Sequence, residues 1–212
     1  MQRAFKCCFS RHIKKTVNQS GELDAAMVHQ WAENNGNGLE KTLDMTDNVL
    51  GDGGAKGIAK LIAAENSSWT SINLSKSEIG DEGAKAIAKA LEQNKTLKEL
   101  NLSENAFGDE GAKAIGKAME ENATMDKIVL PKFTWEKHSV TWQLTEKRLT
   151  DNDMLVVAFL LPNMTALSTL SLASNQLGEK GVDYLSKAMS NIKLLKTLDM
   201  ANNVLGDGGA KG

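Results

Sequence analysis

A four-residue pattern that recurs at nearly constant spacing constrains this chain more than any other feature. Seven segments have apolar residues at their second and fourth positions, namely residues 42–45, 71–74, 99–102, 127–130, 141–144, 169–172 and 197–200. The steps between their last residues are 29, 28, 28, 14, 28 and 28 residues. Repetition at a period of about 20–50 residues is typical of units that bury their apolar side against neighbouring units. The spacing therefore predicts a solenoid.

Each unit begins with a short strand. Leu100 and Leu102 alternate with the polar Asn101, which predicts a strand with the leucines buried and Asn101 outside. In four of the seven units an asparagine follows three positions later, at Asn48, Asn105, Asn175 and Asn203. We expect its amide to bond turn backbone groups inside the stack, which water cannot reach.

A helix is expected to follow each strand and turn. After the glycine-containing turn at residues 108–111, apolar residues recur at helical spacing, as Ala112, Ile115, Ala118 and Met119. Asp109 in this turn is a residue type that favours helix N-caps, so we predict that it caps this helix.

The pattern L-x-x-L-x-L-x-x-N-x-L, the helix in each full unit and the Leu-Gly-Asp-x-Gly turn resemble the ribonuclease-inhibitor class of leucine-rich repeats. The resemblance covers residues 40–212. It implies an α/β solenoid shaped as a horseshoe, with parallel strands on the concave face and helices on the convex face. Ribonuclease inhibitors, sensor-protein repeat domains, Ran GTPase activators and tropomodulin-like actin regulators share this pattern.

One unit departs from it. The step of 14 residues leaves no room for a helix, and Phe133 and Lys147 stand where asparagine is expected. We predict a helix-less unit at about residues 131–140, which either bulges from the solenoid or pairs back as an irregular hairpin. Residues 154–161 are apolar all round, and we interpret them as a helix that covers the gap.

The basic residues of the first 21 positions set this segment apart from the repeats. Residues 1–21 carry a charge of +5 and no acid, whereas the whole chain has a net charge of −2. We interpret them as a basic flexible leader, with two alternatives: an amphipathic membrane-surface helix or a mitochondrial transit peptide. Cys7 and Cys8 are adjacent and cannot staple a fold, which favours a reducing, cytoplasmic setting. On a membrane they would be candidates for lipidation.

The two ends of the array differ in their expected protection. Leu23, Met27 and Trp31 lie four residues apart, which predicts an N-terminal capping helix and entry segment over residues 22–39. Residues 198–212 nearly repeat residues 43–57, so the last repeat reads as truncated. We expect an uncapped C-terminal end that favours self-association.

Residues suited to chemistry are sparse. The pI near 6.0 gives no reason to expect nucleic-acid binding. The three histidines lie far apart, which argues against a metal site or a catalytic triad. The glycine-rich segment 51–57 lacks the spacing and the Lys-Ser/Thr of a phosphate-binding loop. We therefore predict no enzymatic activity, no cofactor and no metal.

Protein binding is the function that the sequence favours. The expected concave-face residues form a polar array with mixed charge, and they are Asp44, Asn73, Asn101, Val129, Gln143, Ser171 and Asp199. Trp135 in the irregular unit is a candidate anchor for a partner if it is exposed, and packing over the gap is the alternative. A second hypothesis is a GTPase activator of the Ran activator type, in which Arg148 would supply an arginine finger.

Overall fold

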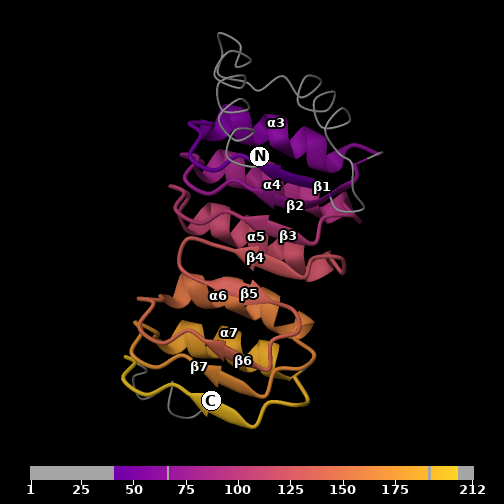
Figure 1. Ribbon diagram of the computed structural model, residues 1–212. Coiled ribbons are helices and arrows are strands. Elements are labelled where there is room, and N and C mark those ends of the chain that lie inside the picture. Colours follow the sequence, from indigo (N-terminus) through magenta and orange to yellow (C-terminus); the bar gives the residue numbers. More distant parts are fainter. Residues whose placement is uncertain (1–40, 66, 191, 205–212) are drawn as a thin grey trace, which may run out of the picture.

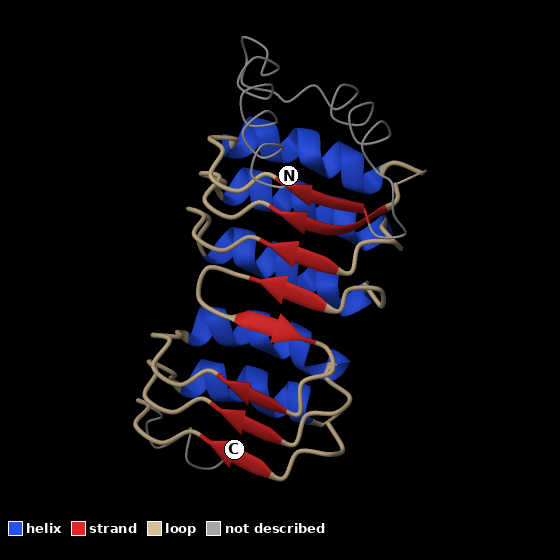
Figure 2. Ribbon diagram, viewed as in Figure 1, coloured by secondary structure: helices blue, strands red, loops and turns tan. Residues whose placement is uncertain are grey.

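The computed structural model describes residues 41–65, 67–190 and 192–204. Strands and helices alternate along the chain and stack in one direction, with all strands in one layer and all helices in the other (Figures 1 and 2). The strands are β1 (Lys41–Asp44), β2 (Trp69–Asn73), β3 (Glu99–Asn101), β4 (Lys127–Val129), β5 (Thr134–Glu136), β6 (Thr141–Gln143), β7 (Thr169–Ser171) and β8 (Thr197–Asp199). The helices are α3 (Gly51–Ala63), α4 (Asp81–Gln93), α5 (Asp109–Glu121), α6 (Asp151–Leu160) and α7 (Glu179–Met189), and a 3-10 turn, η1 (Leu161–Asn163), follows α6. The predicted α/β solenoid is confirmed.

The strand layer consists of two sheets. β1 to β5 form the N-terminal sheet, and β6 to β8 form the C-terminal sheet. All neighbours pair in parallel except β5, which runs antiparallel to β4. The registers join equivalent residues of successive repeats, so that Leu100 pairs with Ile72 on one side and with Ile128 on the other. The sequence period therefore sets the register of the sheet, because paired residues are one repeat apart.

The core lies between the two layers. The strand residues that the alternation assigned to the interior, such as Leu43, Leu100 and Leu102, are buried from β1 to β7, whereas Leu198 in β8 is exposed. Small residues let adjacent helices approach closely: a Cβ atom added to Gly83 in α4 would lie only 2.8 Å from the Ala55 Cβ in α3. The alanine- and glycine-rich helix faces thus serve packing between repeats.

The predicted asparagine ladder is present. Asn105 accepts hydrogen bonds from the backbone N–H groups of Ser77 (3.1 Å) and Ile79 (3.0 Å) in the preceding repeat. Its amide donates to the carbonyl oxygens of Leu74 and Leu102. Asn175 makes the same set of contacts to its own preceding repeat. Each amide satisfies buried backbone groups of two repeats at once.

A second set of asparagines lies at the helix C-termini. Asn94 and Asn122 are buried, and their amides donate to the carbonyl oxygens of Ile62 and Leu91 in the preceding repeat, both at 2.7 Å. Both residues begin Asn-x-Thr triplets, which match the glycosylation acceptor sequence. The side-chain nitrogen that would carry a glycan is enclosed in the fold, so these triplets serve the repeat structure.

The prediction that the aspartate at the start of a helix caps that same helix is wrong. Asp109 is the first residue of α5, and the N-cap position belongs to Gly108. Asp81 of α4 instead accepts hydrogen bonds from the N–H groups of Gly108 (2.9 Å) and Gly111 (2.8 Å) in the next helix. Asp52 does the same for α4, and Asp151 does so for Gly178 at the start of α7. Each aspartate caps the helix of the following repeat rather than its own.

This capping between repeats gives a testable prediction. Asp81→Ala is expected to lower the free energy of unfolding by about 1–2 kcal/mol, because two N–H groups at the start of α5 lose their acceptor. Asp81→Asn keeps one acceptor oxygen and should cost less. Urea unfolding measures both. Asp109→Ala is the matched control, because Asp109 accepts from the Asn152 side chain rather than from a glycine N–H. A loss at Asp109 equal to that at Asp81 would contradict capping across repeats.

The helix-less unit pairs back on the array, as one of the two alternatives predicted. β5 lies against β4 with Trp135 opposite Ile128, in place of the strand-turn-helix of an ordinary unit. α6 then packs directly beside α5, where a Cβ on Gly116 would lie 3.0 Å from Val156. α6 is fixed by its own capping box between Thr150 and Asp153. The helix layer therefore continues past the irregular unit, and α6 covers it as expected.

The predictions for residues 1–21 and 22–39, including Cys7 and Cys8, lie outside the described residues. At the other end of the described array, Leu194, Leu198 and Val204 are exposed. Within the described residues, β8 pairs only with β7. These features support the prediction of self-association, which stays a prediction.

Candidate protein-interaction surface

The inner face is defined here as the side of the strand layer that is turned away from the helices. The predicted residues lie in one row across it, because the register aligns Asp44, Asn73, Asn101 and Val129 in the N-terminal sheet. Gln143, Ser171 and Asp199 are aligned in the same way in the C-terminal sheet. Asp44, Asn73, Asn101 and Val129 are half-buried, whereas Gln143 and Asp199 are exposed.

A second row, two residues earlier in each parallel strand, was not predicted. In the N-terminal sheet it contains Thr42, Ser71, Glu99, Lys127 and, on the antiparallel β5, Glu136. In the C-terminal sheet it consists of Thr141, Thr169 and Thr197. The signal was available, because the strand alternation that places Asn101 outside also places Glu99 outside.

Four residues of the first row also have a structural role. The side-chain oxygens of Asp44, Asn73, Asn101 and Asp199 accept the backbone N–H two residues later, at 3.0–3.1 Å. Such Asx turns end a strand by offering the backbone a local acceptor. The recurrence of Asp and Asn at this position is explained by the turn, independently of any partner.

Two predicted binding residues are not available on this surface. Trp135 has 0% of its surface exposed, so the proposal of an exposed aromatic anchor is wrong and the alternative, packing over the gap, holds. Its inward position follows from the pairing of β5 with β4, which turns Thr134 and Glu136 outward and Trp135 toward the core. Ser171 is also buried, and its hydroxyl is hydrogen-bonded to the Thr145 hydroxyl at 2.8 Å.

Charge is concentrated on the N-terminal sheet. Lys127 and Glu136 form an ion pair of 2.7 Å between β4 and β5. Their hydrogen bond lowers the pKa of the Glu136 carboxyl and raises the pKa of the Lys127 ammonium from the ordinary values. In the loops after β2 and β3, Lys76 and Glu104 lie 3.5 Å apart. The threonine row of the C-terminal sheet is uncharged, so the two sheets offer different chemistry.

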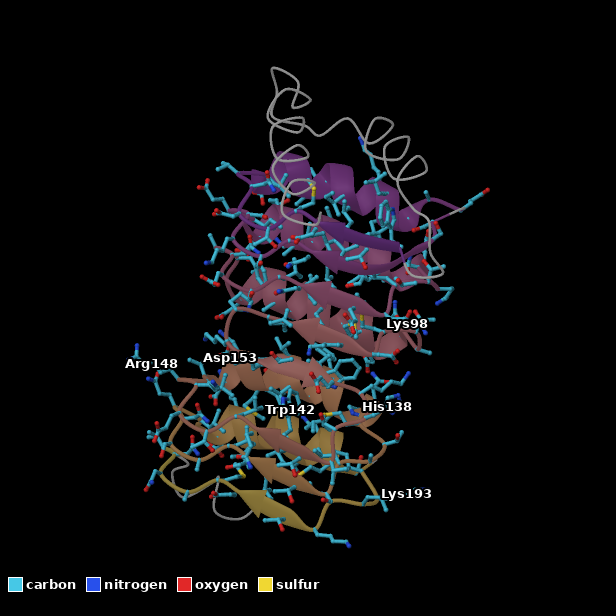
Figure 3. The ribbon with its side chains drawn as sticks, in the orientation of Figure 1. Lys98, His138, Trp142, Arg148, Asp153 and Lys193 are labelled. Carbon is cyan, nitrogen blue, oxygen red and sulfur yellow. The ribbon has the colours of Figure 1, made fainter. Side chains whose placement is uncertain are left out.

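The loops that follow the strands carry Arg148, the residue of the GTPase-activator hypothesis. Arg148 is exposed at one edge of the array, on the same side as Asp153, whereas His138 lies at the opposite edge (Figure 3). The backbone of Arg148 is in the left-handed region, with φ of 54°. Asn175 of the next repeat accepts from the N–H groups of both Lys147 and Leu149, which flank it. This contact fixes the loop and leaves the Arg148 side chain outside.

A small pocket of about 60 Å³ opens where the irregular unit meets α5 and α6. Its walls are mainly apolar and include Phe107, Leu130, Phe133 and Val156. At its rim the Lys132 ammonium lies 2.6 Å from the buried Asp153 carboxylate. The Asp153 carboxylate also accepts hydrogen bonds from the backbone N–H and the hydroxyl of Thr150, so its contacts are structural.

Two classes of site were searched for among the described residues. No group of three or more His, Cys, Asp or Glu side chains in that part of the chain is arranged to hold a metal ion. No helix there has the length and apolar character needed to cross a membrane.

Parallel strands stacked at a constant repeat, with a helix outside each ordinary unit, define a leucine-rich-repeat solenoid. A family model described as Leucine Rich repeat matches residues 41–59, 65–88, 93–116, 163–186 and 192–212, together more than half of the chain. The chain belongs to the leucine-rich repeat family. No curated protein matches it. The matches leave out residues 117–162, the stretch that contains the helix-less unit.

Proposed function

We propose that this protein is a non-catalytic scaffold that binds a protein partner through the inner face. Leucine-rich repeats generally mediate protein–protein interaction. The observation that carries the proposal is the alignment of two rows of side chains, polar except for Val129, across successive strands of each sheet. Such a surface presents hydrogen-bonding groups whose positions are set by the backbone, which lowers the entropy lost on binding.

The two sheets can be tested separately as binding surfaces. Glu99→Arg changes the second row of the N-terminal sheet, and Thr141→Arg changes that of the C-terminal sheet; both residues are exposed. Lys89→Glu on the exposed side of α4 is the matched control on the helix layer. We expect a protein captured by the wild-type chain from cell extract to be lost with at least one inner-face variant and retained with the control. Loss with the Lys89 variant alone would place binding on the helices and refute the proposal.

The GTPase-activator hypothesis has its own readout. If it held, Arg148→Ala would abolish stimulated GTP hydrolysis while leaving the capture of the GTPase intact, because an arginine finger acts on the transition state. The exposed position of Arg148 in a strand-to-helix loop is compatible with this role. The inner-face proposal rests on several aligned residues and is the one we favour. Peripheral membrane contact through residues 1–21 remains a separate proposal.

A further inference from the structure

We propose that the helix-less unit is a hinge between two blocks, residues 41–136 and 141–204, which change their relative angle about the contact between α5 and α6. The inference concerns the array itself, so it stands whether or not the inner face binds a partner. Three kinds of contact join successive repeats: strand pairing, the asparagine ladder and the aspartate caps. All three are interrupted at the helix-less unit.

The first contact that stops is strand pairing. Every strand from β1 to β5 is hydrogen-bonded to its neighbour, and so is every strand from β6 to β8, but β5 and β6 are not. In place of a backbone ladder, the Trp142 indole N–H donates to the Thr134 carbonyl oxygen at 2.7 Å. The ring thus takes an acceptor that strand pairing would use. Phe133 packs edge-on against the same ring, with centroids 5.8 Å apart.

The second and third contacts are the side-chain ladders. Asn105 bonds the repeat before it, and Asn175 bonds the repeat that contains Lys147. Phe133 and Lys147 occupy the two asparagine positions between them. Lys147 belongs to the first unit after the junction and has no amide to bond the unit before it. Likewise, Asp52 and Asp81 each cap the next helix, but Asp109 does not cap α6, which has its own capping box. All three changes fall at the boundary between the two blocks, where the Lys132–Asp153 ion pair and the Trp142–Thr134 hydrogen bond are side-chain contacts on the strand side.

On the helix side of the junction, α5 and α6 remain in direct contact. Asn163 donates to the Met119 carbonyl oxygen at 3.1 Å, and the Asn152 side chain donates to Asp109. Gly116 and Val156 bring α5 and α6 into close contact. A hinge with its axis along the helices and its opening between β5 and β6 follows, because packed helices tolerate small rotations whereas a hydrogen-bonded sheet resists them.

The layer dimensions agree with this division. Neighbouring strands lie about 4.8 Å apart, and packed helices lie about 8–10 Å apart. Each ordinary repeat adds one strand to the strand layer and one helix to the helix layer. Because strands are spaced more closely than helices, the strand layer is the shorter of the two along the stack. Between α5 and α6 the chain has three strands, β4, β5 and β6, where an ordinary repeat has one. The strand side is locally the longer, and the reversed arrow of β5 marks this place in the strand layer (Figure 2).

Spin-label distances test the motion in the full chain. Lys60, Lys117 and Lys187 are exposed and occupy the same position in α3, α5 and α7. Cysteine pairs at 60/117 and 117/187, with Cys7 and Cys8 replaced by serine, therefore both span two helix steps. The second pair crosses the junction and the first does not. We expect the distance distribution of the 117/187 pair to be about twice as wide as that of the 60/117 pair, or to have two maxima, as for other hinged pairs of blocks. Equal widths would overturn the hinge.

Native-state hydrogen exchange tests the division into blocks with a different readout. Ile87 in α4 and Leu185 in α7 are buried at equivalent positions. Ile87→Ala is expected to accelerate the slowest-exchanging amides of residues 41–136 and to leave those of residues 141–204 unchanged; Leu185→Ala should do the reverse. If either alanine variant does not fold, the valine variant of that residue replaces it. Equal acceleration in both blocks would show one cooperative unit and overturn the proposal.

Discussion

Trp135→Ala is expected to lower the free energy of unfolding by about 3–5 kcal/mol, the range for removing a large buried aromatic side chain. Trp135 is the largest fully buried side chain of the described array. It lies in the irregular unit, which has no helix of its own between β5 and β6. Urea unfolding followed by circular dichroism measures the loss. A cost below about 1 kcal/mol would show that the surrounding side chains collapse into the space.

Replacing the two indoles with phenylalanine separates packing from hydrogen bonding. The Trp135 Nε1 atom is buried without a hydrogen-bond partner in the structure, whereas Trp142 Nε1 donates to Thr134. Trp135→Phe removes an unpaired buried donor, which itself costs about 1–3 kcal/mol in the native state. We therefore expect Trp135→Phe to destabilise the protein less than Trp142→Phe. The reverse order would indicate that the Trp135 N–H finds an acceptor, such as a bound water.

Leu102→Ala is expected to cost about 2–5 kcal/mol, because Leu102 is fully buried between the strand and helix layers. Its neighbour Asn101 is the matched comparison, since it belongs to the same strand end but points to the inner face. Asn101→Ala loses the hydrogen bond to the Ser103 N–H, with an expected cost of about 0.5–1.5 kcal/mol. The two midpoints of urea unfolding give the comparison directly. Equal costs would contradict the strand register on which the inner face is defined.

The two blocks bear on how the inner face could be used. The N-terminal sheet carries the Lys127–Glu136 pair and Glu99, and the C-terminal sheet carries the threonine row. A partner that contacts both sheets would also select one angle of the hinge, and the free-energy difference between the angles would then contribute to its affinity. A partner that contacts one sheet would bind independently of that angle. The separate variants Glu99→Arg and Thr141→Arg distinguish these two cases.

The sequence by itself determined the parts of this protein that repeat. The period specified the order of strands and helices, and the alternation within each unit specified which leucines are buried. The asparagine ladder could be predicted because its asparagines stand at the same position of their units, three residues after the last strand leucine or methionine. The polar inner face followed from the same alternation, and its second row could have been identified by extending it two residues earlier.

The tertiary structure decided the features that depend on how one repeat sits against the next. Asp109 was expected to cap its own helix because it begins that helix, but the stacking of α5 beside α4 brings the Asp81 carboxylate to the Gly108 and Gly111 N–H groups instead. In the irregular unit no period exists to assign a face, so Trp135 could be interior or exposed. The antiparallel pairing of β5 with β4 settled this, and it also divided the sheet. Local residue preferences act within a unit, whereas these outcomes arise from contacts between units that the chain order alone does not specify.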